Sequence, residues 1–170
     1  TLMNILGGVL PADGGNMSLD GQAYLPKSAR DADKAGIAFI HQELNLFANL
    51  TIAENLFLTQ FPRRFRTIID RKCMRRRASE LLDRVGLTLS PNLKVENLST
   101  GERQLVEIAK ALARKARVLI LDEPTSSLSE RETRGLFQLL MQLRTAGMAL
   151  IYISHALGDV RQLCDQVVVL

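Results

Sequence analysis

The sequence of 170 residues predicts an α/β fold with a mostly parallel sheet and an inserted helical segment. Residues 118–121 are continuously apolar, as in a strand buried on both faces of a parallel sheet. Helix and strand patterns then alternate to the end, which indicates parallel strands joined by right-handed crossovers. Residues 51–115 carry only helix signals. We therefore expect an α/β core at 1–50 and 116–170 and a helical subdomain at 51–115.

Each element follows from a local signal. Three Ser/Thr-x-x-Glu capping boxes begin helices, since each side chain satisfies an exposed backbone donor of the other residue. Glycines at the ends of apolar faces mark where helices stop. The boxes pair Thr51 with Glu54, Ser99 with Glu102 and Ser129 with Glu132. We expect helices near 2–6, 51–57, 70–85, 99–114, 129–147 and 156–164, and strands near 16–20, 36–40, 118–121, 149–153 and 167–170.

Composition excludes several classes of protein. Hydrophobic residues make up 46% and charged residues 24%, which is typical of a globular domain rather than a disordered or collagen-like chain. Cys73 and Cys164 lack the spacing of a zinc knuckle or a disulfide framework. No apolar run approaches the roughly 18 residues that cross a bilayer. The net charge of +4 does not indicate a nucleic-acid partner, and we expect none.

Both ends of the sequence have the pattern of interrupted elements. Residues 2–6 resemble a helix already under way, without an initiator Met, and residues 167–170 resemble the middle of a strand. We therefore expect the sequence to be a segment of a longer protein.

Polar side chains follow three of the predicted strands. Asp122 and Glu123 come directly after strand 118–121, His155 follows strand 149–153, and Gln42 follows strand 36–40. Open α/β sheets bind ligands beyond the carboxyl ends of their strands. Alternation along the strand would send the two side chains to opposite sides, Asp122 toward a metal and Glu123 toward a water. An isolated Asp-Glu pair is more often a solvated strand end, and a lone His is more often a surface or structural residue. The prediction of a ligand site therefore depends on polar residues at all three strand ends together.

Two other patterns have ordinary structural explanations beside functional ones. Residues 98–102 can be only a capping box, or a helix start whose free N–H groups and dipole bind a phosphate. Residues 71–77 hold five basic side chains in seven, with Arg63, Arg64 and Arg66 before them. We interpret this run as a solvated helix face, with Phe61 and Phe65 the only aromatic residues near it for stacking on bases.

In order along the chain, these pieces resemble the ATP-binding subunits of ABC transporters. Residues 98–102 resemble the signature sequence, although Thr100 and Glu102 replace its commonest Gly and Gln. Residues 118–124 resemble the Walker B strand, and 126–129 the D-loop, with Ser129 in place of the frequent Asp. The stretches 41–46, 50–58 and 106–111 are similar to the first ATPase half of bacterial ribose, xylose and galactose importers.

The resemblance implies a P-loop NTPase-like fold and a set of residue roles. Glu123 would be the general base, and His155 and Gln42 would be the other catalytic residues. Asp122 and Gln42 would hold Mg²⁺. Ser99, Thr100, Gly101 and Glu102 would bind the ATP of an opposite ATPase domain.

The resemblance also implies cofactors, partners and a location. These are ATP and Mg²⁺, transmembrane permease subunits, a second ATPase domain and, indirectly, a periplasmic sugar-binding protein. The implied location is the cytoplasmic face of the inner membrane, as a peripheral subunit that powers uptake of a monosaccharide.

The family's phosphate-binding loop, G-x-x-x-x-G-K-[S/T], is absent from the printed residues. Thr1 matches its last position or the residue after it, and would also bind the cofactor. Because nothing else cradles the β- and γ-phosphates, we expect the segment alone not to bind ATP tightly.

Two alternatives remain. One is a non-transport ABC module, such as a ribosome-associated factor, although residues 124–129 and the flank of Gln42 disfavour it. The other is a truncated remnant that only docks to partners, against which the intact Glu123 and His155 argue.

Overall fold

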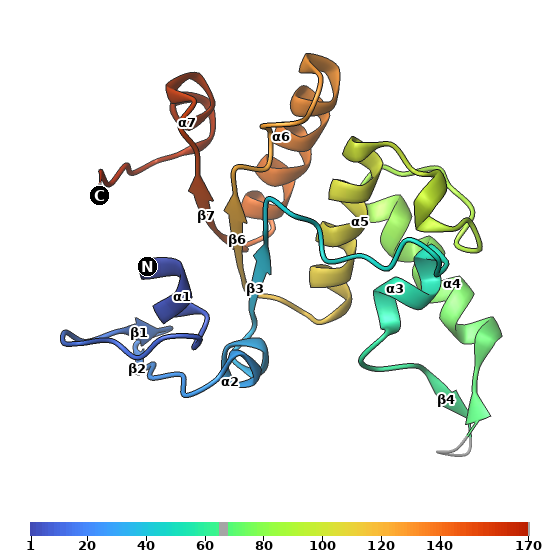
Figure 1. The fold of residues 1–170 in the computed structure, drawn as a ribbon, viewed down its shortest axis with the longest axis horizontal. Helices are drawn as coiled ribbons and strands as arrows, with labels where there is room; N and C mark the ends of the chain where they lie inside the picture. The colour runs from blue at the N-terminus through green and yellow to red at the C-terminus, as the bar shows by residue number, and fades with distance from the viewer. Residues whose placement is uncertain (65–67, 170) are drawn as a thin grey trace.

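The computed structural model describes residues 1–64 and 68–169 and places a three-stranded parallel sheet at the centre of the chain (Figure 1). The helices are α1 (Leu2–Leu6), α2 (Ala29–Lys34), α3 (Ile52–Phe57), α4 (Arg71–Arg84), the 3₁₀ turn η1 (Val95–Asn97), α5 (Thr100–Ala113), α6 (Glu130–Thr145) and α7 (Leu157–Leu163). The strands are β1 (Ser18–Leu19), β2 (Gln22–Ala23), β3 (Ile37–Ile40), β4 (Arg63–Arg64), β5 (Ile68–Ile69), β6 (Val118–Asp122) and β7 (Ala149–Ile153).

The central strand β6 pairs in parallel with β3 on one side and β7 on the other. Leu119, Ile120 and Leu121 are fully buried. Leu119 and Leu121 belong to one apolar cluster, and Ile120 belongs to a second cluster on the opposite face. The predicted parallel sheet is confirmed, and its continuous apolar strand reflects burial on both faces.

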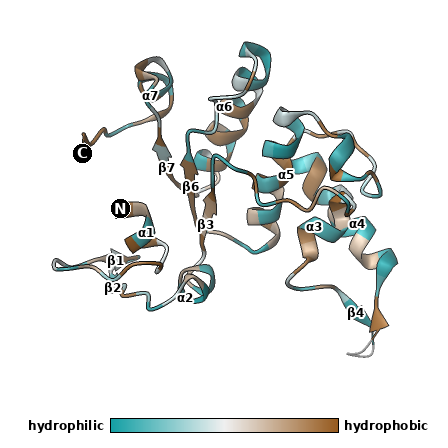
Figure 2. Cartoon of the chain, in the orientation of Figure 1, coloured by the Kyte–Doolittle hydropathy of each residue, from teal (hydrophilic) through white to brown (hydrophobic). Residues whose placement is uncertain are grey.

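Different elements cover the two faces of the sheet. The larger cluster combines one face with α6 and with the helices α3, α4 and α5, and the smaller one includes Tyr24, Ala32 and side chains of α1. Figure 1 shows α3, α4 and α5 on one side of β3, and α1, α2 and the β1–β2 hairpin on the other. In Figure 2 the central strands β3, β6 and β7 are mostly brown, while α4 and α5 carry both colours, as amphipathic helices do.

Several expectations need correction. Residues 51–115 are not purely helical, because β4 and β5 form a short antiparallel ladder between α3 and α4. Helix α2 and strand β2 were not predicted; α2 buries only Ala32 and has no apolar periodicity to reveal it. The terminal strand expected at 167–170 is wrong for residues 167–169, which pair with no strand and are exposed, while Leu170 lies outside the described residues. Without a neighbouring strand an apolar run has no partner for its backbone hydrogen bonds.

All three capping boxes form as predicted. At the start of α3, the Thr51 N–H donates to Glu54 Oε2 at 2.8 Å and the Glu54 N–H donates to Thr51 Oγ1 at 3.2 Å. The same reciprocal pair begins α5, with Ser99 and Glu102, and α6, with Ser129 and Glu132.

Within the described part of the chain, no helix combines the length and the apolar character needed to cross a membrane.

The first prediction concerns the α3 capping box. Replacing Thr51→Ala removes the hydroxyl that accepts from the Glu54 N–H, and Ile52 and Ala53 beside it are buried. We expect the free energy of unfolding to fall by about 1 kcal/mol, measured by urea denaturation. Thr88→Ala, at an exposed position, is the matched control; equal stability of the two variants would contradict the capping role.

We expect acid to destabilise the protein, because two capping-box carboxylates have lowered pKa values. The N–H and hydroxyl of Thr51 hold the pKa of Glu54 below its ordinary value, and the hydroxyl and N–H of Ser129 do the same for the pKa of Glu132. A lowered folded-state pKa stabilises the protein above the unfolded-state pKa, and this stabilisation is lost as the pH falls through the folded-state pKa. We therefore expect stability to decrease below about pH 4.5, near the ordinary pKa of Glu.

Unfolding at a series of pH values checks this. Glu54→Gln should be less stable at pH 6 and should lose less stability between pH 6 and pH 3 than the unaltered protein. An identical pH dependence in the two proteins would show that Glu54 does not contribute.

Candidate functional site

The side chains predicted to act together lie at one edge of the sheet, where β3, β6 and β7 end; we name it the carboxyl edge. Ile40 pairs with Leu121 in the ladder, so Gln42 leaves β3 at the level where β6 ends. Asp122 pairs with Ile153, and His155 follows two residues later. Parallel pairing in register therefore brings Gln42, Asp122, Glu123 and His155 to the same edge.

Glu123 does not continue the alternation of the strand. Its φ of 45° lies in the left-handed region, which non-glycine residues adopt at a cost of roughly 1–2 kcal/mol. Backbone bonds hold it there: its N–H donates to Ile153 O at 3.0 Å, and Ser126 donates to Glu123 O from both its N–H and its hydroxyl. A fixed turn, rather than strand alternation, thus separates the direction of Glu123 from that of Asp122.

The two acid–base side chains of the edge meet. His155 Nε2 lies 3.0 Å from Glu123 Oε1. The imidazole is 92% exposed and the Glu123 side chain 28% exposed, so the pair is open to solvent from the histidine side. This contact requires β6 and β7 to be neighbours, and the two strands pair in parallel.

A half-buried polar cluster that the sequence did not predict joins the elements that carry this pair. Thr125 Oγ1 donates to Asp159 Oδ2 at 2.7 Å and Tyr152 Oη donates to the same oxygen at 3.0 Å. Burial, reinforced by the charge of Asp159, raises the pKa of Tyr152 to about 12, so its hydroxyl stays a donor. The cluster ties the turn after Glu123 to β7 and α7, between which His155 lies. Threonine, tyrosine and aspartate far apart in sequence carry no recognisable spacing.

The residues resembling the signature sequence lie at the start of α5. The Glu102 carboxylate is engaged in the capping box, since Ser99 N–H donates to Glu102 Oε2 at 2.7 Å. A second carboxylate approaches from α6: Ser99 Oγ donates to Glu132 Oε1 at 3.5 Å. A Cβ on Gly101 would lie only 2.4 Å from that oxygen, so a larger residue there would displace the Glu132 carboxylate from the start of α5.

The start of α5 is therefore an anion position that Glu132 already occupies. The hydroxyl and N–H of Ser129 lower the pKa of Glu132, and the N–H of Gly101 and the hydroxyl of Ser99 add to this effect. The sequence showed Glu132 only as the capping-box partner of Ser129. Its proximity to α5 depends on the packing of α6 near the start of α5, and no pattern in the sequence predicts that packing.

Thr1 and the basic residues 71–77 belong to other elements than the Glu123–His155 pair. Thr1 begins α1, its side chain makes no capping hydrogen bond, and its carbonyl accepts from the Ile5 N–H at 3.2 Å. The basic side chains of residues 71–77 are exposed on α4, as a solvated face requires. One of them, Arg77, also lies over the Phe57 ring, 5.2 Å from its centroid. Phe65 and Arg66, considered with this run, lie outside the described residues.

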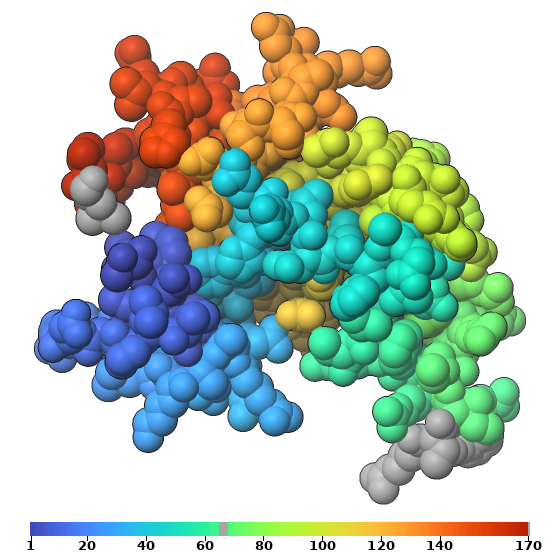
Figure 3. Space-filling view, viewed as in Figure 1, coloured from blue at the N-terminus to red at the C-terminus, as the bar shows by residue number. Residues whose placement is uncertain are grey.

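A cavity of about 290 Å³ lies on the side of β3 that faces α2 and α5. Asn45, Glu107, Lys110 and Arg114 contribute to its polar lining, and Met3 and Phe39 to its apolar lining. Figure 3 shows the surface hollowed between the blue region of α1 and α2 and the green helices.

The chain is similar over its whole length, or nearly so, to sugar import proteins. It is 48% identical over 170 residues to the ribose import ATP-binding protein RbsA of Rhodopirellula baltica, covering 100% of this chain and 33% of the relative. It is 50% identical over 171 residues to RbsA of Chromobacterium violaceum, covering 100% and 34%. An arabinose import ATP-binding protein of Burkholderia cenocepacia is 47% identical over 169 residues, covering 99% and 33%. The chain thus spans about a third of the length of these relatives.

Solved structures share the fold. A nucleotide-free ATP-binding cassette from an ABC transporter superposes with a TM-score of 0.81 at 23% identity, covering 96% of this chain and 68% of that one. A dimeric cassette in a post-hydrolysis state bound to ADP and Pi superposes with a TM-score of 0.74 at 25% identity, covering 95% and 71%.

The family model described as "ABC transporter" matches residues 1–126, which include the carboxyl edge as far as Glu123 and the start of α5. The chain belongs to the ABC transporter family.

Proposed function

We propose that the protein carrying this chain binds and hydrolyses ATP to power uptake of a monosaccharide through a membrane importer. The observation that carries the proposal is the 3.0 Å contact between Glu123 and His155 at the carboxyl edge, beside Gln42 and Asp122. The import proteins for ribose and arabinose to which the chain is similar support the choice of cargo.

In this proposal Glu123 acts as general base. Phosphoryl transfer depends mainly on positioning and electrostatic stabilisation, so the base must hold one water in line with the γ-phosphate. The backbone bonds to Ile153 and Ser126 fix the Glu123 main chain while its carboxylate stays accessible. His155 reaches the same carboxylate and, being mostly exposed, is free to turn toward a γ-phosphate.

Asp122 and Gln42 fit a Mg²⁺ ion through their oxygen atoms. Mg²⁺ prefers hard oxygen ligands and commonly binds one or two protein side chains, waters and substrate phosphates. No group of three or more acidic, His or Cys side chains in residues 1–64 and 68–169 is arranged to hold a metal, so phosphates and waters would supply the remaining ligands. When bound, the ion neutralises charge that develops on the phosphate oxygens.

We further propose that the start of α5 receives the ATP of an opposite ATPase domain. Thr100 and Gly101 belong to the first turn, whose N–H groups have no partner within a helix. Ser99 adds its hydroxyl, and Glu102 holds the turn in shape. An arriving phosphate would replace the Glu132 carboxylate near Ser99. Thr1, at the start of α1, would contact the phosphates of the ATP bound by its own domain.

The implied assembly follows from the same reasoning. We propose that residues 51–115 form a helical subdomain and that 1–50 and 116–170 form the α/β core. The partners are transmembrane permease subunits, a second ATPase domain and, through the permease, a periplasmic sugar-binding protein. The protein would work peripherally on the cytoplasmic face of the inner membrane.

The third prediction tests the base. In the full-length gene product that contains these residues, Glu123→Gln should lower the rate of ATP hydrolysis at least 100-fold, the lower range for losing a general base. Bound Mg²⁺–ATP should be retained, since the amide keeps the shape of the side chain. Phosphate release gives the rate, and equilibrium binding of ATP gives the affinity.

Glu80→Gln, which changes an exposed carboxylate on α4, is the matched control and should hydrolyse ATP normally. Hydrolysis at the unaltered rate in Glu123→Gln would overturn the assignment of the base.

A further inference from the structure

The segment that carries Gln42 crosses from the sheet to the helices α3 and α5. It leaves β3 after Ile40 and reaches α3 at Ile52. Within the described residues, no hydrogen bond holds the Gln42 side chain, which is exposed. The position of Gln42 therefore depends on how the rest of residues 41–51, which we name the crossing segment, is held.

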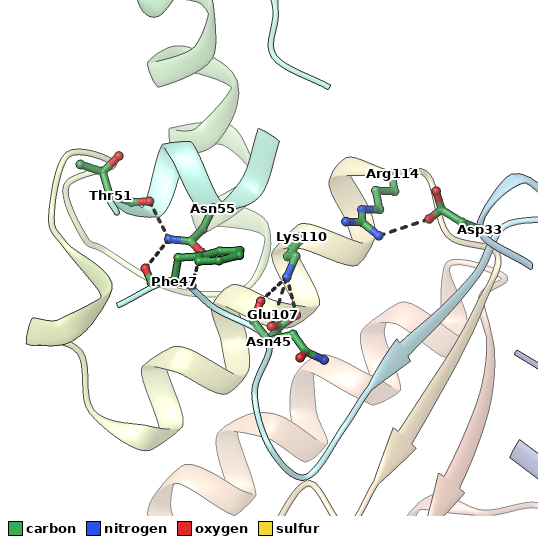
Figure 4. A network of polar contacts seen from close by, with 8 residues as sticks. All are labelled: Asp33, Asn45, Phe47, Thr51, Asn55, Glu107, Lys110 and Arg114. Atoms are coloured by element: carbon green, nitrogen blue, oxygen red, sulfur yellow. Dashed lines mark hydrogen bonds and ion pairs between the residues drawn. The ribbon is translucent and has the colours of Figure 1, made fainter. Parts of the chain in front are cut away.

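Two buried or nearly buried side chains hold the crossing segment (Figure 4). Lys110 Nζ, from α5, donates to Asn45 O at 2.7 Å, three residues after Gln42. Further along, Asn55 is fully buried and bonds both backbone groups of Phe47, accepting from its N–H at 2.8 Å and donating to its carbonyl at 3.0 Å. Of these two polar anchors, Lys110 is the nearer to Gln42, and Leu44 and Leu46 also pack against the larger apolar cluster.

The environment of Lys110 is unusual for a lysine. Its side chain is only 13% exposed and that of Glu107 only 7%. Lys110 Nζ lies 3.3 Å from Glu107 Oε1 and 3.4 Å from Oε2. With Asn45 O, these oxygens give the ammonium group three acceptors. Because a buried ammonium is costly unless it is fully paired, this geometry restrains Asn45 strongly.

The same helix is also tied to the opposite side of the sheet. Arg114, one turn after Lys110, forms an ion pair with Asp33 of α2 at 3.3 Å. The cavity of about 290 Å³ lies beside both contacts and is lined by Asn45, Lys110 and Arg114. The crossing segment thus has open space on one flank, and Lys110 is a fixed point beside it.

We infer that Lys110 is a positioning residue for Gln42: its bond to Asn45 O sets where Gln42 lies at the carboxyl edge and couples that position to α5. The inference rests on the proposed function, in which Gln42 acts at the reacting phosphate. Glu107 restrains the ammonium group, and the start of the same helix carries Ser99 and Gly101. A movement of α5 would thereby be transmitted to Gln42 through this hydrogen bond, beside the packing of Leu44 and Leu46 against the larger apolar cluster.

A purely structural explanation is available, because Glu107 and Lys110 also form an i,i+3 ion pair within α5. Removing Lys110 alone would leave a buried, unpaired carboxylate and destabilise the protein for that reason. The test therefore compares Glu107→Gln, in which the ammonium group keeps Asn45 O and a glutamine carbonyl as acceptors, with the double variant Glu107→Gln/Lys110→Met, which loses the bond and leaves no buried charge. Urea denaturation of both variants measures the stability that each one loses.

In the full-length gene product, we expect Glu107→Gln to hydrolyse ATP within about twofold of the unaltered protein. The double variant should show a kcat roughly 10- to 100-fold lower, as for a misplaced catalytic group, with the Kd for ATP unchanged. Lys110→Arg should restore most of the kcat, since arginine can still donate to Asn45 O. Lys72→Met, at an exposed lysine of α4, should have no effect.

A double-mutant cycle with Gln42→Ala separates positioning from structure. If Lys110 acts through Gln42, Glu107→Gln/Lys110→Met should cause no further loss of kcat in the Gln42→Ala background. Losses that multiply would overturn the inference, as would an unchanged kcat in the double variant. An unchanged kcat in Gln42→Ala, with Glu123→Gln inactive, would overturn it too and leave the proposed function standing. Normal turnover in Glu123→Gln would overturn both.

Discussion

The burial of β6 on both faces is the constraint on which the other features depend. Leu119, Ile120 and Leu121 are inaccessible to solvent and alternate between two apolar clusters. Because both faces of β6 are covered, the strand must lie in the middle of the sheet, with a paired strand on each side. Parallel pairing with β3 and β7 then aligns three strand ends at one edge. Gln42 and His155, far apart in sequence, reach the same edge because of this packing. No direct interaction between them is needed to bring them there.

Local backbone geometry refines what the sheet assembles. Glu123 adopts a left-handed conformation, and three backbone and hydroxyl donors hold the turn in place. Oδ2 of the half-buried Asp159 joins the turn to Tyr152 of β7. These bonds place a carboxylate and an imidazole 3.0 Å apart while leaving both accessible. Hydrogen bonds hold the main chain of the Glu123 turn, and the edge is open where a substrate would approach.

Sequence reasoning predicted the parts of this arrangement that leave a periodic or spaced signal. The sheet strands, the three capping boxes and the neighbouring positions of Glu123 and His155 follow from apolar runs and short motifs. Helix α2 was missed because it buries a single alanine, and the ladder of β4 and β5 because two-residue strands carry no alternation. Lys110 and Glu132 were missed as functional candidates for a different reason. An i,i+3 ion pair and a capping glutamate look like surface features until the fold shows that one is buried and the other reaches a second helix.

The central claim is that one nucleotide site forms at the carboxyl edge of the sheet. The structure of the full-length gene product with Mg²⁺ and a non-hydrolysable ATP analogue tests it most directly. We expect the metal beyond the ends of β3 and β6, beside Gln42 and Asp122, and the γ-phosphate facing Glu123 and His155. A nucleotide bound elsewhere, for example in the cavity between α2 and α5, with the carboxyl edge empty, would contradict it.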